Sequence, residues 1–199
     1  MSRPTVGILL YPDAEELDWA GPWEVFTMAA QGDHPMKVVT IAQEEGTIRC
    51  AKGLRVLADH TFETAPTLDV IVVPGGQGSR VEMKNRVLLD WLASASESCR
   101  FVTSVCTGAI LLCKAGLADG REVTTHWGYI ETLRELAPQV TVREKVRYIQ
   151  DGRIVTSAGV SAGIDMSLWL VGQIWGVEHA RGTQRFMEYD PAPPYTADV

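Results

Sequence analysis

The sequence predicts a single α/β domain, residues 1–199, in which helices cover both faces of a parallel sheet with a mixed edge. Short apolar and β-branched runs at residues 6–10, 70–73 and 101–105 are the first indication, because strands without a polar face are typical of a buried parallel sheet. Segments with helical character separate these runs, and strands that alternate with helices form parallel sheets.

The N-terminal half is expected to supply three of the sheet strands. After the first strand we expect a loop at residues 12–19, and then a helix that begins at Gly21–Pro22, since proline suits the first helical turn. That helix is expected to end near residue 30. The remaining elements are a strand at 37–41, a polar hairpin at 49–58 around Lys52–Gly53, a strand at 70–73 and a helix at 85–98.

The C-terminal half is expected to supply the mixed edge of the sheet. Residues 146–150 and 153–157 are predicted to pair as an antiparallel hairpin, because Asp151–Gly152 between them is a hairpin turn signal. The other elements are a short helix at 131–137, helices at 161–175 and 177–187, and an extended proline-rich stretch at 190–194.

Composition limits the classes of function. With 199 residues, 46% of them hydrophobic, the chain can bury one substantial core. The net charge of −7 and the lack of a basic cluster argue against nucleic acid as a partner. No apolar run approaches the length of a membrane span and the N-terminus has no signal-peptide pattern, so we expect no membrane partner.

The cysteines and histidines give no sign of a disulfide framework or a metal site. The four cysteines have no CxxC spacing, which favours a reduced, cytoplasmic location, and the four histidines form no metal-binding motif. We therefore expect no metal. The cysteines are Cys50, Cys99, Cys106 and Cys113, and the histidines are His34, His60, His126 and His179.

The most informative stretch is FVTSVCTGAILL at residues 101–112. A β-branched run stops at Cys106 and a helix-forming run starts directly after it, which predicts a strand, a sharp turn and a helix with small residues on either side of the turn. A thiol at a helix N-terminus is favoured as the thiolate. We therefore interpret Cys106 as a nucleophile in preference to a merely buried cysteine, and we expect Cys113 to pack inward.

Two further loops are expected at the same end of the sheet, where ligands bind in folds of this class. In one, Gly75 and Gly76 could expose backbone N–H groups that, with the N–H of Thr107, stabilise charge on a substrate; a plain tight turn is the alternative. The other contains three carboxylates within residues 15–18, next to Trp19. A carboxyl group there could have a perturbed pKa and transfer a proton, and the pattern does not choose among the three.

His126 follows another predicted strand end. It could orient or deprotonate Cys106, as a base beside a nucleophile does. The alternative is that it caps the following helix. We expect it near the pocket and not as the essential base, because the helix N-terminus can itself lower the pKa of the thiol.

Together these motifs resemble the DJ-1/PfpI superfamily, a branch of the class I glutamine amidotransferase-like fold. The resemblance covers nearly the whole chain and implies a flavodoxin-like architecture with a cysteine nucleophile elbow. Thr107 stands where peptidase-like members have His, and no later His–Glu pair follows Ser157 as in glutamine amidotransferases. The matching segments, in the family's order, are residues 14–18, 72–76, 105–108, 124–126 and 154–159.

Within that superfamily, several strings are similar to those of isonitrile hydratases and of sensor domains of AraC-type regulators. They are LDWAGP at 17–22, CTG at 106–108, THW at 125–127, SAGVSAGID at 157–165 and QRFMEYDP at 184–191. The resemblance selects Asp18 as the acid and implies a homodimer, an isonitrile as small-molecule substrate and no cofactor.

The resemblance also implies a mechanism, in which Asp18 protonates the isonitrile carbon and Cys106 attacks it to give a thioimidate. Water positioned by Asp18 and Thr107 would release a formamide, and Trp19 would help to form an apolar substrate pocket. Two alternatives stay open. One is a glyoxalase or deglycase that acts on reactive aldehydes, and the other is a non-enzymatic ligand-sensing or redox-sensing domain.

Overall fold

A seven-stranded sheet forms the centre of the computed structural model, which describes residues 3–31 and 34–193. The strand order is β10-β11-β7-β6-β1-β2-β5, and all neighbours pair in parallel except β10 with β11. The strands are β1 (Thr5–Leu9), β2 (Lys37–Ala42), β5 (His60–Thr61), β6 (Val70–Val73), β7 (Phe101–Val105), β10 (Tyr148–Asp151) and β11 (Ile154–Ser157).

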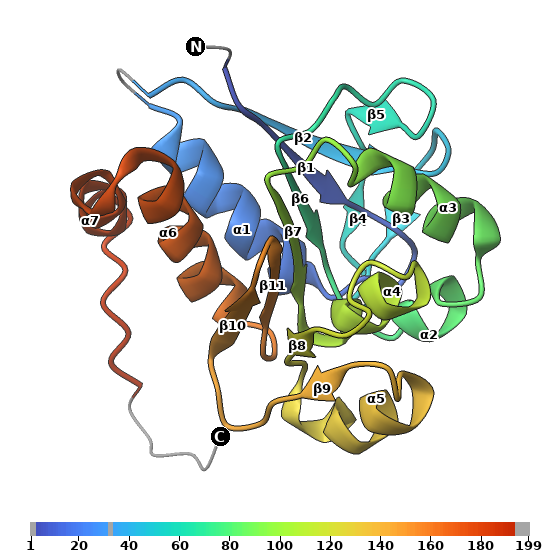
Figure 1. Cartoon of the computed structure of the whole chain (residues 1–199). Coiled ribbons are helices and arrows are strands. Elements are labelled where there is room, and N and C mark those ends of the chain that lie inside the picture. The colour runs from blue at the N-terminus through green and yellow to red at the C-terminus, as the bar shows by residue number, and fades with distance from the viewer. Residues whose placement is uncertain (1–2, 32–33, 194–199) are drawn as a thin grey trace.

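Helices cover both faces of this sheet, which confirms the predicted fold class (Figure 1). On one face α1, α6 and α7 pack against one another, and on the other face α3 and α4 lie with α2 beside them. The helices are α1 (Glu16–Ala29), α2 (Ser79–Glu82), α3 (Arg86–Ala95), α4 (Ala109–Lys114), α5 (Ile130–Leu136), α6 (Ala162–Trp175) and α7 (Val177–Phe186).

Two small sheets and two 3₁₀ turns complete the described residues. The predicted polar hairpin is present as the antiparallel pair β3 (Ile48–Arg49) and β4 (Arg55–Val56). Near α5, β8 (Glu122–Val123) pairs in parallel with β9 (Thr141–Val142). The 3₁₀ turns η1 (Cys106–Gly108) and η2 (Trp127–Tyr129) precede α4 and α5.

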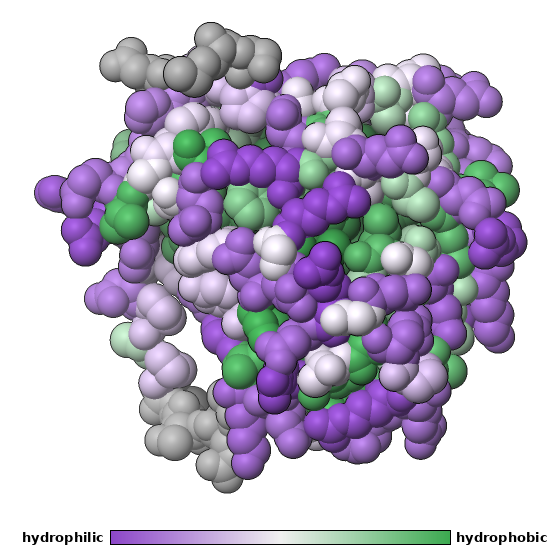
Figure 2. Space-filling model, in the orientation of Figure 1, coloured by the Kyte–Doolittle hydropathy of each residue, from purple (hydrophilic) through white to green (hydrophobic). Residues whose placement is uncertain are grey.

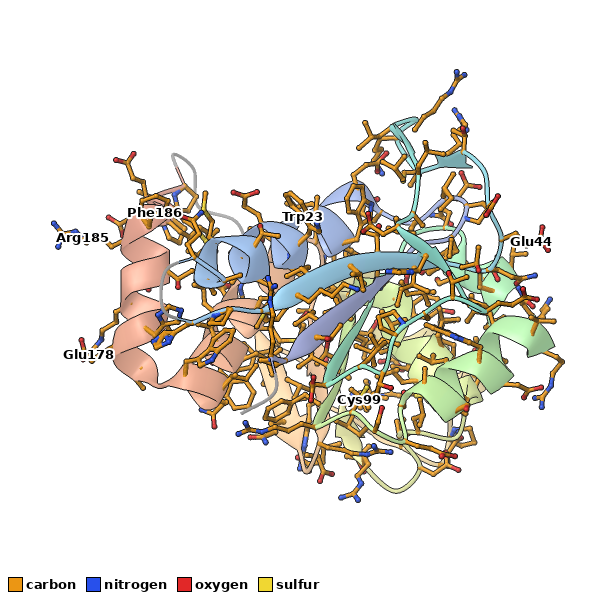
Figure 3. All side chains as sticks on the ribbon, turned by 90° about the horizontal axis from the view of Figure 1, so that it is seen from above. Trp23, Glu44, Cys99, Glu178, Arg185 and Phe186 are labelled. Atoms are coloured by element: carbon orange, nitrogen blue, oxygen red, sulfur yellow. The ribbon has the colours of Figure 1, made fainter. Side chains whose placement is uncertain are left out.

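The core follows from the apolar strands. All residues of β6, β7 and β11 are buried, because helices cover both faces of the strands in the middle of the sheet. Figure 2 shows hydrophilic residues over most of the face seen in Figure 1, with apolar residues scattered among them. Seen from above in Figure 3, α7 forms one border of the molecule, and Glu178 and Arg185 point outward from it.

The largest departure from the sequence prediction is the start of α1. The loop expected over residues 12–19 ends early, and the helix begins at Glu16, so Pro22 lies inside the helix. Contacts distant in the sequence fix this start, because the backbone N–H of Glu15 donates to the Gly75 carbonyl over 3.0 Å. Asp18 is therefore held in the first helical turn and not in a loop.

The other predicted elements are present with shifted ends. The strand predicted before His126 ends at Val123 in β8, and residues 124–125 lie outside helices and strands. Residues 190–193 of the predicted extended stretch also lie outside helices and strands, and Pro194 lies outside the described residues. None of the helices in residues 3–31 and 34–193 is long and apolar enough to cross a membrane.

Candidate active site

The candidate site lies where the carboxyl ends of β6, β7 and β11 meet. The parallel registers pair Val73 with Ser104 and Ser157 with Val105, so the three strands end at the same level of the sheet. The turn after β6, the elbow after β7 and the turn after β11 consequently surround Cys106. The start of α1 adds Asp18 to this group, because Asp18 binds the turn after β6.

Cys106 has the backbone of a nucleophile elbow. Its φ is 57°, in the left-handed region that residues other than glycine seldom adopt. The Cys106 N–H donates to the Ala158 carbonyl over 3.1 Å, and the Cys106 carbonyl accepts the Thr125 hydroxyl over 2.8 Å. Gly108 is required nearby, because a side chain there would collide with the Val73 carbonyl. The neighbouring loops thus hold the strained residue in place.

Three groups surround the Cys106 sulfur. The backbone N–H groups of Thr107 and Val160 act on the thiol and lower its pKa, and the Asp18 carboxyl group interacts with the thiol and raises its pKa. Val160 also has a positive φ, 44°, at the turn after β11. The surroundings of the sulfur therefore include the strained backbone at Val160 and the carboxyl group of Asp18.

Asp18 is the buried acid of the site. Its side chain is 0% exposed, its Oδ2 accepts the Gly75 N–H over 2.9 Å, and its Oδ1 accepts no hydrogen bond from an N–H or O–H donor of the described residues. Burial raises the pKa of Asp18 to about 7, against the lowering effect of the Gly75 N–H. The carboxyl group can therefore gain or lose a proton near neutral pH.

The Cys106 thiol does not have the low pKa that the sequence led us to expect. Burial and the neighbouring Asp18 charge raise its pKa to about 12, while the Thr107 and Val160 N–H groups lower it by less. The predicted stabilisation of the thiolate by the helix N-terminus is outweighed, because Cys106 is only 6% exposed. A neutral Asp18 would remove one of the two causes that raise the pKa of the thiol, while burial would remain.

The glycine turn after β6 does not offer free N–H donors to a substrate. The Gly75 N–H donates to Asp18 and the Gly76 N–H donates to the Thr107 hydroxyl over 3.0 Å, so both have partners in this structure and the oxyanion role stays a prediction. The turn positions the site instead. A Cβ at Gly75 would lie 2.5 Å from the Thr107 nitrogen, and the buried Tyr11 hydroxyl donates to the Pro74 and Gly75 carbonyls over 2.5 and 3.0 Å.

The Thr107 hydroxyl is likewise engaged inside the protein. Besides accepting the Gly76 N–H, it hydrogen-bonds with the Ser79 hydroxyl over 3.0 Å and donates to the Gly76 carbonyl over 3.2 Å. Its expected role in positioning water is therefore not supported by this geometry. What Thr107 presents to the sulfur is its backbone N–H.

The geometry separates the three carboxylates that the sequence left equivalent. Glu15 pairs with Lys52 over 2.8 Å, and Glu16 accepts the backbone N–H groups of Lys52 and Leu54 over 2.7 and 3.4 Å. Both side chains therefore face the β3–β4 hairpin. Asp18 is the one of the three that reaches the sulfur.

His126 caps a 3₁₀ turn, and Trp19 lies in the hydrophobic core. His126 Nδ1 accepts the Gly128 N–H over 3.1 Å, which caps η2, and its ring lies against Gly159. Burial lowers the pKa of His126, and no hydrogen bond joins its ring to Cys106 among the described residues. The Trp19 side chain is buried in the hydrophobic core.

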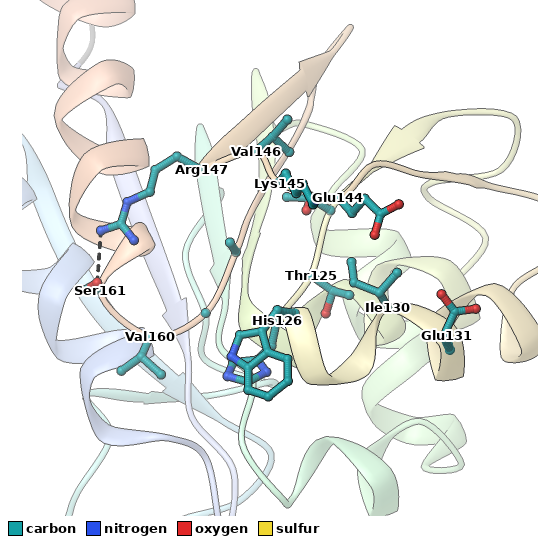
Figure 4. A pocket seen from close by; sticks show the side chains of 14 residues that line it. Thr125, His126, Ile130, Glu131, Glu144, Lys145, Val146, Arg147, Val160 and Ser161 are labelled. Atoms are coloured by element: carbon teal, nitrogen blue, oxygen red, sulfur yellow. Dashed lines mark hydrogen bonds between the residues drawn. The ribbon is translucent and has the colours of Figure 1, made fainter. Parts of the chain in front are cut away.

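A large cavity adjoins the site on the side of the turn after β11. Its volume is about 1030 Å³, and it is bounded by residues 124–127, 130–131, 144–147 and 158–161. Figure 4 shows His126 and Val160 at its wall, and Arg147 reaching Ser161 over 2.9 Å. Trp19, which we expected to help form the substrate pocket, does not line this cavity and is part of the hydrophobic core.

Tyr11, Val160 and Thr125 are the contributors to the site that sequence reasoning missed. Their contributions depend on main-chain atoms or on a hydroxyl bound to a carbonyl, and such contacts leave no residue-type pattern. The position of Val160 next to Gly159, after a predicted strand, was the one available signal. Across residues 3–31 and 34–193, no group of three His, Cys, Asp or Glu side chains could hold a metal ion.

Known proteins are similar to this chain in sequence and in fold. The model of the DJ-1/PfpI family matches residues 4–173. Isonitrile hydratase of Pseudomonas putida is 38% identical over 96% of this chain and 80% of its own length. The HTH-type transcriptional regulator GbdR of Pseudomonas aeruginosa is 28% identical over 94% of this chain, which spans about half (51%) of that regulator. A crystal structure of a THiJ/PfpI family protein from Pseudomonas syringae has a TM-score of 0.91 at 29% identity, over 100% of this chain and 80% of that one.

Proposed function

The chain belongs to the DJ-1/PfpI family, and we propose that it is an isonitrile hydratase, which adds water to the terminal carbon of an isonitrile to give an N-substituted formamide. One observation carries the proposal. The buried Asp18 carboxyl group, with a pKa of about 7, interacts with the Cys106 thiol. A proton can therefore be exchanged near neutral pH at the atom that attacks.

The first half of the reaction adds the thiol across the isonitrile carbon. Cys106 passes its proton to Asp18, and Asp18 gives it to the terminal carbon, where a C–H bond forms. The sulfur attacks the same carbon and forms a C–S bond, which gives a neutral thioimidate, R–N=CH–S. The Thr107 and Val160 N–H groups favour the transient thiolate, since both donate to the sulfur.

The second half hydrolyses the thioimidate. Asp18, now ionised, takes a proton from water as the water oxygen bonds to the carbon, and the nitrogen takes up that proton. The C–S bond then breaks with its electron pair on sulfur, the new hydroxyl group loses its proton through Asp18, and the formamide leaves. The sum is one isonitrile and one water consumed for one formamide, with both residues restored.

Similarity supports this proposal over other activities in the family. The relative named isonitrile hydratase is the more similar of the two curated relatives described above, and this chain covers 80% of it. In addition, a carboxyl group with a pKa of about 7 can accept the thiol proton and give it to the isonitrile carbon near neutral pH.

The test is turnover of cyclohexyl isonitrile by the purified chain, with formamide measured by chromatography and methylglyoxal assayed in parallel. We expect formamide from the wild type, and an intact mass increased by one isonitrile when the reaction is quenched early. The increase should be absent from Cys106→Ser. Consumption of methylglyoxal without any formamide would replace the proposal with a glyoxalase. Binding of the isonitrile with neither product would favour a sensing domain.

A further inference from the structure

Arg80, on α2 beside the glycine turn, is a partly buried cation without an acidic partner. Its Nη1 donates to the Gly76 carbonyl over 2.8 Å and lies 3.4 Å from the Ser79 hydroxyl. Within residues 3–31 and 34–193, no carboxylate lies within 4.0 Å of its guanidinium group. In a chain with a net charge of −7, an unpaired cation at this place is a notable feature.

The second observation is Tyr129, on which the guanidinium group lies. The Arg80 Cζ is 4.7 Å from the centre of the Tyr129 ring, a cation–π distance. Tyr129 is 5% exposed, and its hydroxyl group has no hydrogen-bond partner among the described residues. A buried hydroxyl without a hydrogen-bond partner is costly, and most buried hydroxyl groups in proteins have one. The Tyr129 hydroxyl is therefore a second donor, after Arg80, that could bind an acceptor on a ligand.

Both groups are connected to the elbow at Cys106 through neighbouring residues. The Gly76 carbonyl that holds Arg80 also accepts the hydroxyl of Thr107, the residue after Cys106. Tyr129 is the last residue of η2, four residues after Thr125, whose hydroxyl donates to the Cys106 carbonyl. Burial lowers the pKa of His126, and the Arg80 charge lowers it further.

We propose that Arg80 and Tyr129 form a subsite for a carboxylate on the substrate, so that the preferred substrate is an isonitrile that also carries a carboxylate group. A guanidinium group binds a carboxylate through parallel charge-assisted hydrogen bonds, and the Tyr129 hydroxyl adds a neutral donor. Only Nη1 of Arg80 has hydrogen bonds within the described residues, which leaves donors on the other nitrogens. The inference rests on the proposed function for the isonitrile and on the geometry of these two residues for the carboxylate.

The first test compares two substrates of equal length, 3-isocyanopropionate and 3-isocyanopropionamide. In the wild type we expect kcat/KM to favour the carboxylate by about 10- to 100-fold, the range of a charge-assisted hydrogen bond. The ratio should fall close to one in Arg80→Gln and recover in part in Arg80→Lys, which keeps the charge. Arg86→Gln is the matched control, because Arg86 is paired with Asp90 on the surface of α3, and it should keep the wild-type ratio. An equal kcat/KM for both substrates in the wild type would overturn the subsite.

The second test does not depend on turnover. Iodoacetamide alkylates Cys106 by forming a C–S bond as iodide leaves, and the rate is followed by mass spectrometry of the Cys106 peptide. We expect butyrate, but not butyramide, to slow this alkylation in the wild type, and butyrate to lose its effect in Arg80→Gln. Equal protection by butyrate and butyramide, or protection unchanged in Arg80→Gln, would refute the inference.

The two tests separate the two proposals. If no isonitrile is hydrated and butyrate still protects through Arg80, the carboxylate subsite stands and the hydratase proposal fails. If both isonitriles are hydrated equally well and butyrate does not protect, the hydratase stands and the subsite fails. Arg80→Lys guards against a folding defect, since it preserves the charge in the same place.

Discussion

Replacing Asp18 with Asn should separate the ionisation of Cys106 from its ability to catalyse. In the wild type the Asp18–Cys106 pair holds two protons below about pH 7 and one proton between about pH 7 and about pH 12. The reaction requires the form with one proton, so kcat/KM should rise through about pH 7 and then level off. In Asp18→Asn that inflection should vanish, and kcat/KM should fall by at least ~10²-fold, because the proton donor is gone.

The thiol of that variant should nevertheless ionise more easily. The Asp18 charge is one of the causes that raise the pKa of Cys106, and an amide at residue 18 removes it while burial remains. Ultraviolet titration of the thiolate should therefore show a lower midpoint in Asp18→Asn than in the wild type. More thiolate together with less turnover is a combination that a purely structural defect would not produce.

The raised pKa of Asp18 also predicts how the free energy of unfolding depends on pH. A shift in the Asp18 pKa from 3.8 to about 7 corresponds to about 4 kcal/mol at ~1.4 kcal/mol per pH unit. Because the folded pKa is raised, the stability is present below pH 3.8 and is lost as the pH rises through about 7. At pH 8 Asp18→Asn should unfold at a higher urea concentration than the wild type, and this advantage should shrink towards pH 4.

Glu15→Gln is the matched control for Asp18→Asn. It removes a carboxylate from the same segment, but that carboxylate pairs with Lys52 and not with the sulfur. Turnover should stay within a few-fold of the wild type, and the inflection should move slightly below pH 7, because the Glu15 charge helps to raise the pKa of Asp18. If Asp18→Asn keeps the inflection near pH 7, then another group titrates there and the assignment of Asp18 as the proton donor is refuted.

The remaining predictions concern the elbow and its neighbours. Cys106→Ser should reduce formamide production to background with an unchanged circular dichroism spectrum, whereas Cys113→Ser, buried on α4, should retain turnover; an exchange of these outcomes would move the nucleophile. His126→Ala should slow turnover by less than the ~10²-fold expected for a general base, with an unchanged thiolate midpoint, and a midpoint that changes would make His126 an activating partner. Gly75→Ala should lower the free energy of unfolding by about 1–3 kcal/mol, measured in urea, because its Cβ would meet the Thr107 nitrogen; wild-type stability would contradict the close approach.

The sequence predicted the fold well where local pattern and burial agree. The short, β-branched apolar runs of β6 and β7 favour buried strands, and these strands are present. Asp151–Gly152 forms the turn of the antiparallel edge, with Gly152 at a φ of 63°. The start of α1 was mispredicted, because Gly21–Pro22 is a strong local signal for a first helical turn. Backbone contacts to the distant turn at Gly75 outweigh that signal, and no local pattern records them.

The candidate site was predictable in its members and not in its electrostatics. The motif order brings Asp18, Gly75 and Cys106 to one end of the sheet, and the structure has them there. The acceptors of the Gly75 and Gly76 N–H groups were not predictable, since they depend on which side chains the fold places beside the turn. In this fold Asp18 and Thr107 do so, which turns a candidate anion site into a scaffold for the acid and for the elbow.

The pKa of Cys106 shows why burial has to be weighed against the helix N-terminus. The turn after Cys106 is a single 3₁₀ turn followed by the six residues of α4, so the N–H groups that reach the sulfur are the main local source of positive potential. Removal of water from the thiol acts in the opposite direction and is larger. In the proposed reaction, the thiol becomes reactive by giving its proton to Asp18, whose own pKa is also raised by burial. In this proposal the two residues act as one unit that shares a proton, a property that depends on the fold bringing them together and not on either residue alone.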